Sequence, residues 1–64
     1  MEKKNYLIIG GYLQTLEDIL EQKARDVAAR GGDANALIAG RYLKECSEIR
    51  TMQEKTNKEM EGLP

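Results

Sequence analysis

Two adjacent glycines near the middle of the chain, Gly31 and Gly32, constrain its fold more than any other feature. Glycine readily adopts the left-handed backbone conformation that ends many helices, and the carboxylate of Asp33 can accept hydrogen bonds from the first free N–H groups of a following helix. Both flanking arms are rich in helix-forming residues. The sequence therefore predicts an all-α fold in which the whole chain forms one two-helix antiparallel hairpin. The expected bounds are a helix over about 6–30, a turn at 31–33 and a helix over about 34–60.

Apolar residues recur at steps of three and four along the first arm, which places them on one face of a helix. Gly10 and Gly11 interrupt the start of this arm, and each glycine costs about 1 kcal/mol relative to alanine inside a helix. We therefore expect a firm helix only from about Gly11, preceded by an extended or loosely helical segment from Tyr6 to Ile9. Polar side chains opposite the apolar residues, Glu17 among them, are expected to be solvated. The predicted core stripe is Ile9, Leu13, Leu16, Leu20, Ala24 and Val27.

The second arm carries its own stripe at helical spacing, which consists of the apolar residues Ala39, Tyr42, Leu43, Cys46 and Ile49 and the polar residue Gln53. Folding the chain about the glycine pair sets apolar residues of the two arms against each other, as in a short coiled coil. The pairs expected to meet are Ala39-Gly40 with Ala24, Leu43 with Leu20, Cys46 with Leu16, and Ile49 with Leu13. The stripe weakens after Met52, so the arm is expected to be exposed or to fray from there, and Gly62-Leu63-Pro64 should end the helix.

A second apolar row, Ile8, Tyr12 and Ile19, runs beside the first stripe. One helix presents an apolar stripe of about 100° to a single core, so one neighbouring helix does not easily cover both rows. The surplus row is either a partner surface or part of a wide core. Ile38 flanks Tyr42 on the second arm in a comparable position. The candidate partner-binding residues are Ile8, Tyr12, Ile19, Ile38 and Tyr42.

The residues that most catalytic and metal sites require are scarce. The chain has no histidine, one cysteine and one serine, Cys46 and Ser47. A useful thiolate needs a base, a cationic neighbour or a helix N-terminus, whereas Cys46 lies on the apolar stripe. Carboxylate metal sites in helix bundles use Glu-x-x-His, which is absent. We expect no enzyme activity, no catalytic residue, no cofactor and no metal.

Charge and hydropathy argue against nucleic acid and membranes as partners. Lysine and arginine total 10 against 11 for aspartate and glutamate, with the signs mixed along both arms, so no single-sign field attracts a polyanion. The apolar run from Tyr6 to Leu13 is far shorter than the roughly 18 residues of a membrane span and lacks a small-residue cleavage site. A lone cysteine fits a reducing compartment. The expected location is the cytoplasm.

A chain of 64 residues is one domain at most, and a domain of this size buries only about 60% of the surface that its unfolded chain exposes. Two helices without a disulfide or a metal rarely supply more than roughly 3 to 5 kcal/mol of stability. We therefore expect the hairpin to assemble, either as a dimeric helical bundle or as a bundle completed by a partner protein.

The turn Arg30-Gly31-Gly32-Asp33-Ala34 resembles that of the small E-type co-chaperones of type III secretion needle proteins. Members of that family are similar in length and form an antiparallel helical hairpin in the cytoplasm. The resemblance implies that this hairpin joins a tetratricopeptide-type co-chaperone and that the pair keeps the needle subunit from polymerising before export. It transfers no binding residues beyond the turn, because 36–41 lacks the aromatic cluster that can follow the turn in the family. The alternative is a small phage or bacterial regulator that inhibits a protein target by helix docking.

Overall fold

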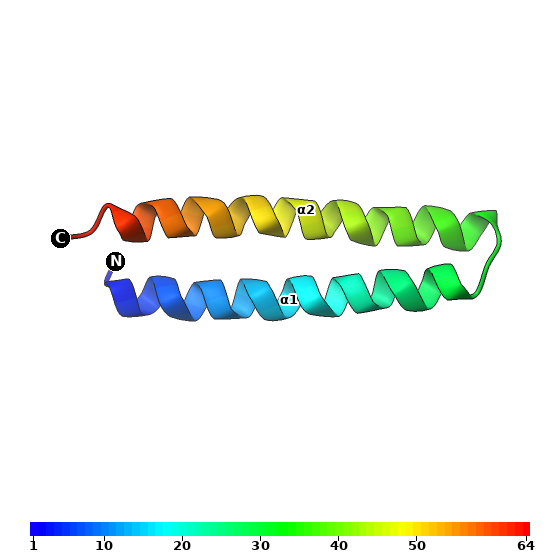
Figure 1. Ribbon diagram of the computed structural model, residues 1–64, viewed down its shortest axis with the longest axis horizontal. Helices are drawn as coiled ribbons and strands as arrows, with labels where there is room; N and C mark the ends of the chain where they lie inside the picture. The colour runs from blue at the N-terminus through cyan, green and yellow to red at the C-terminus, as the bar shows by residue number, and fades with distance from the viewer.

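The chain forms two antiparallel helices, α1 (Lys3–Ala29) and α2 (Asp33–Glu61), which lie side by side over their full length (Figure 1). This computed structural model describes residues 1–64, and the molecule is a rod of 51 × 14 × 11 Å. The turn closes one end of the rod and both termini lie at the other, which we call the open end. The predicted all-α hairpin is confirmed.

Helix α1 begins earlier than the sequence suggested. It starts at Lys3 and continues without a break through Gly10 and Gly11, so the expectation of a loose segment over 6–9 was wrong. Tyr6 and Leu13 on either side of the glycines are half-buried. Tertiary packing against α2 therefore outweighs the helix-propensity penalty of the glycines, as is usual for helices in folded proteins.

The two helices meet along a single line of contact, the interhelical seam, in which residues alternate at steps of four and three. This period of 3.5 residues is that of a coiled coil. Nearly all residues outside the seam are exposed, and those within it are buried or half-buried. The seam consists of Tyr6, Gly10, Leu13, Glu17, Leu20, Ala24 and Val27 on α1, and Asn35, Ala39, Tyr42, Cys46, Ile49, Gln53, Thr56 and Met60 on α2.

Three residues that the sequence assigned to the core are exposed instead: Ile9, Leu16 and Leu43. Leu16 and Leu43 therefore do not form the buried core pairs with Cys46 and Leu20 that the sequence suggested. Small residues in the seam allow two helix axes to approach closely, and Ala24 and Ala39 are among the most buried residues of the chain. Helix α1 is accordingly rotated so that Gly10 and Ala24 face α2, and this rotation moves Ile9 and Leu16 to the side.

The turn depends on the glycine pair, because both residues have positive φ: 76° at Gly31 and 88° at Gly32. Gly32 combines this φ with a ψ of 155°, a region of backbone space that is essentially restricted to glycine. Asp33 does not cap α2 as expected. It is the first residue of the helix, where its negative charge is favourable beside the helix N-terminus, and no side chain bonds the free N–H groups. The turn thus comprises 30–32.

The C-terminal end of α2 packs against α1 more extensively than the sequence suggested. Most residues from Thr51 to Glu61 are exposed, as expected, but Gln53, Thr56 and Met60 continue the seam and are half-buried, and the helix does not fray before Glu61. The helix ends at Glu61, directly before Gly62-Leu63-Pro64, as predicted. Both helices therefore stay paired as far as the open end.

Candidate interaction surface

The most unusual property of the hairpin is how little apolar surface it buries. Only four apolar residues, Ala24, Ala39, Cys46 and Ile49, are buried, and no side chain is fully enclosed. Eleven large apolar residues are exposed. Scattered exposed apolar residues are normal on protein surfaces, whereas a contiguous group marks a binding site. The arrangement of the exposed residues therefore decides the interpretation.

Five of the exposed residues form what we call the lateral face, which consists of Ile9, Tyr12, Leu16 and Ile19 on α1 and Met52 on α2. The four α1 residues follow one another at steps of three, four and three, the same spacing as in the seam. At 100° per residue they lie about 100° around the helix from the side that faces α2. Tyr12 is 73% exposed and Ile19 48%. Helix α1 thus carries a second coiled-coil-like stripe that nothing in the hairpin covers.

A groove of about 330 Å³ lies beside the lateral face near the open end. Its apolar lining comes from Met1, Tyr6, Ile9, Leu13 and Met52, and its polar lining from Lys55, Thr56 and Glu59. Because Ile9 and Met52 come from opposite helices, the groove places them on the same side of the rod.

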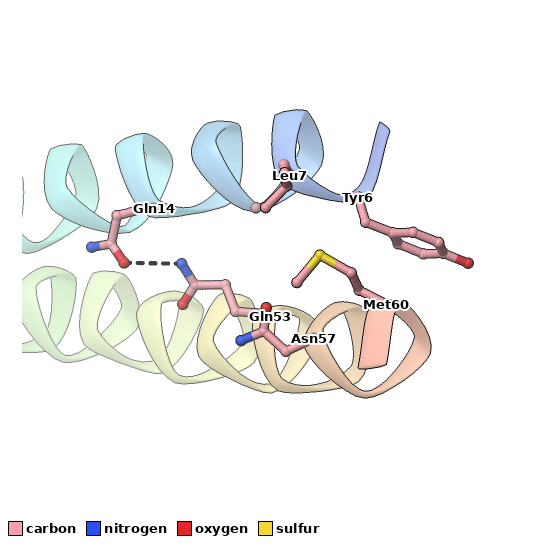
Figure 2. A pocket seen from close by; sticks show the side chains of 7 residues that line it. Tyr6, Leu7, Gln14, Gln53, Asn57 and Met60 are labelled. Carbon is pink, nitrogen blue, oxygen red and sulfur yellow. Dashed lines mark hydrogen bonds between the residues drawn. The ribbon is translucent and has the colours of Figure 1, made fainter. Parts of the chain in front are cut away.

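A second groove of about 330 Å³ lies on the other side of the seam and is shown in Figure 2. Leu7 of α1 and Met60 of α2 point into the space between the helices there, while the ring of Tyr6 extends toward the open end. Gly10 lines this second groove, and no atom lies within 4 Å of where its Cβ would be. A seam position without a side chain therefore leaves the open end loosely packed.

A polar cluster interrupts the middle of the seam around Glu17, which is only 7% exposed. The prediction that Glu17 is solvated was therefore wrong. Arg50 of α2 donates from Nη2 and Nε to Oε1 of Glu17 at 2.8 and 3.3 Å. The hydrogen bond to this carboxylate raises the pKa of Arg50. Partners across the seam thus satisfy the buried carboxylate, and burial without them would be costly.

Gln53 completes the cluster. Its Nε2 donates to Oε1 of Gln14 at 3.1 Å, the bond drawn in Figure 2. Rotation of the same amide by 180° instead points its nitrogen at Oε2 of Glu17, 2.9 Å away. Together with the pair formed by Glu17 and Arg50, these contacts fix which residues of α1 and α2 lie level with each other.

Cys46 is buried beside this cluster, and its Sγ donates to the backbone carbonyl of Glu17 at 3.6 Å. Burial raises the pKa of the Cys46 thiol, and the negative charge of Glu17 raises it further. A buried thiol that stays protonated is a packing residue and a poor nucleophile.

The structure exposes four of the five candidate partner-binding residues, Ile8, Tyr12, Ile19 and Ile38. Tyr42 differs, because it lies in the seam and is half-buried. Sequence reasoning missed Ile9, Leu16 and Met52 as surface residues. Strict alternation of steps of three and four, a period of 3.5 residues, separates the seam residues of α1 from its lateral-face residues. Accepting any step of three or four assigns both sets to one stripe. Neither helix contains a stretch apolar and long enough to cross a membrane.

Comparison with protein-family models, with curated proteins and with solved structures finds no match for this chain.

Proposed function

We propose that this chain is a non-catalytic protein–protein interaction module that docks through its lateral face onto a helix of another protein chain. The observation that carries the proposal is the second stripe of α1, Ile9, Tyr12, Leu16 and Ile19, which has the spacing of a helix-packing surface and no intramolecular partner. Helix-in-groove recognition uses anchors at this spacing. Each large apolar side chain contributes roughly 1.5 to 3 kcal/mol when it becomes fully buried.

The resemblance of the turn gives the most concrete version of this proposal, a cytoplasmic co-chaperone of a type III secretion needle subunit. In this version the hairpin joins a tetratricopeptide-type co-chaperone, and the complex keeps the needle subunit unpolymerised. Tetratricopeptide repeats stack helix pairs into extended concave surfaces, which suit a slender helical rod. The 51 Å length and the apolar side of the hairpin support such a contact.

The test is affinity purification from the native cell with tagged wild-type chain and with the double variant Tyr12→Glu, Ile19→Glu. We expect specific proteins to co-purify with the wild type and to be lost with the variant, while circular dichroism shows that helicity is largely retained. The matched control is Leu37→Glu, which places a charge on a large apolar residue of α2 that is 77% exposed and lies outside the lateral face. Retention of the same proteins by the double variant would show that the lateral face is not the docking surface.

A further inference from the structure

We propose that Arg50 is a positioning residue for the lateral face, because its ion pair with Glu17 holds α1 in the rotation that leaves Ile9 and Leu16 on the surface. Without Arg50, α1 turns about its axis, Glu17 reaches water, and the two apolar residues take its place against α2. The rotation itself requires no other protein. Its consequence for docking rests on the proposed function, since the lateral face is the surface that changes.

Helix α1 has two sets of residues that can face α2, and the sets share most of their members. The shared residues are Leu13, Leu20, Ala24 and Val27. The observed seam adds Gly10 and Glu17 to them, whereas the stripe expected from the sequence adds Ile9 and Leu16 instead. At 100° per residue the mean directions of the two sets differ by roughly 30 to 40°. A small turn of α1 therefore exchanges one set for the other.

Apolar packing favours the set that the structure does not use. Gly10 brings no side chain to the seam, and no atom lies within 4 Å of its Cβ position. Glu17 brings a carboxylate that is only 7% exposed. Ile9 and Leu16, at 36% and 45% exposed, would bury more apolar surface in those two places. The observed rotation therefore requires a contact that offsets this difference.

Arg50 provides that contact. It donates to Oε1 of Glu17 from Nη2 at 2.8 Å and from Nε at 3.3 Å, and it is the only cation paired with this carboxylate. Gln53 offers the other carboxylate oxygen one neutral hydrogen bond at 2.9 Å when its amide is rotated. A buried carboxylate without a paired cation is costly. Removal of Arg50 therefore destabilises the observed rotation more than an arrangement in which water solvates Glu17.

The two members of the ion pair are not equivalent. Leucine in place of Glu17 makes the seam apolar at this level, so α1 has no buried charge to expose and no reason to turn. Arg50 is then released, but its side chain is 64% exposed and stays hydrated. Loss of Arg50 therefore turns α1, whereas loss of Glu17 does not.

The turn changes one part of the lateral face and leaves the other in place. Tyr12 and Ile19 lie farther around α1 from the seam than Ile9 and Leu16 do, so a turn of this size leaves them on the surface. Ile9 and Leu16 leave the face and enter the hairpin. The face thus loses two of its four α1 residues through a change at Arg50, which is not one of its members.

The test measures the solvent exposure of individual side chains by NMR relaxation in the presence of a neutral, soluble gadolinium chelate. It compares the wild-type full chain with Arg50→Met. We expect the relaxation enhancement at the Ile9 and Leu16 methyl groups to fall at least about twofold in the variant, because each then becomes a knob enclosed by residues of α2. The enhancement at Tyr12 and Ile19 should stay close to its wild-type value.

Two further variants show whether Arg50 acts through Glu17. Arg41→Met is the matched control, because Arg41 is an exposed arginine of α2 that forms no ion pair, and it should leave the exposure of Ile9 and Leu16 unchanged. In a chain that already carries Glu17→Leu, Arg50→Met should likewise have no effect on these two residues.

Unchanged relaxation enhancement at Ile9 and Leu16 in Arg50→Met overturns the inference. An equal fall in the chain that carries Glu17→Leu also overturns it, since Arg50 would then act by another route. Loss of the helical circular dichroism signal in Arg50→Met overturns it as well, because the turned arrangement would then not be a stable alternative.

Affinity purification with Arg50→Met separates this inference from the proposed function. If α1 turns but the same proteins co-purify in wild-type amounts, the positioning role of Arg50 is supported and the lateral face is not the docking surface. If Ile9 and Leu16 stay exposed while the double variant at Tyr12 and Ile19 loses those proteins, docking is supported and the role of Arg50 is overturned. A turn accompanied by loss of the proteins supports both.

Discussion

Gly10 offers the sharpest test of how the two helices pack. It is a seam residue, and the space beside its Cα is open, with a groove on either side of the seam at this level. Leucine at this position gains helix propensity, worth about 1 kcal/mol relative to glycine, and also fills the gap between the helices. A partly enclosed leucine side chain adds about 1 to 2 kcal/mol, somewhat less than full burial. Gly10→Leu should therefore stabilise the fold by about 2 to 3 kcal/mol.

Gly11 is the matched control, because it lies in the same helix one residue on, is exposed and also has nothing within 4 Å of its Cβ position. Gly11→Leu gains propensity alone, about 1 kcal/mol. At roughly 4 to 8 °C per kcal/mol for a chain of this size, Gly10→Leu should raise Tm by about 10 to 20 °C and Gly11→Leu by about 4 to 8 °C.

Circular dichroism during thermal and urea unfolding measures both variants, at one protein concentration because association adds to apparent stability. Equal Tm shifts for the two variants would refute the assignment of Gly10 to the seam, since they would mean that Gly10 does not face α2. A lower Tm for Gly10→Leu alone would mean that the helices approach too closely there to admit a side chain.

Glu17→Leu should raise the free energy of unfolding by about 1 to 2 kcal/mol in urea titrations, because an apolar side chain then occupies the seam and the released Arg50, 64% exposed, stays hydrated. A clear loss of stability would instead assign the polar cluster a net stabilising role. Because the pKa of Cys46 is raised in the folded state, the unfolded chain loses this proton first, and stability should fall as pH rises above the ordinary thiol pKa of 9.0. Cys46→Ala should lack this fall in stability, whose slope is at most about 1.4 kcal/mol per pH unit. If the stabilities of the wild type and of Cys46→Ala depend identically on pH, the thiol is not buried.

The fold class could be predicted from the sequence because its signals are local. A glycine pair with positive φ breaks the chain, and the residues on both sides favour helix, so the hairpin and the stop before Gly62 follow without knowledge of distant contacts. The sequence also indicated that Ile8, Tyr12 and Ile19 form a surplus row beside the core stripe, and their exposure in the structure decides between a surface row and a wide core.

The rotation of each helix about its axis was decided only by tertiary structure. Ile9 and Leu16 fit the apolar period as well as Leu13 and Leu20 do, so the sequence of α1 alone does not say which pair faces α2. The choice depends on how closely the two backbones approach at Ala24, and on a partner for Glu17 that comes from 33 residues away. Steric fit and satisfaction of a buried charge are properties of the assembled pair of helices. They placed a carboxylate inside the hairpin and left an apolar stripe of α1 uncovered on its surface.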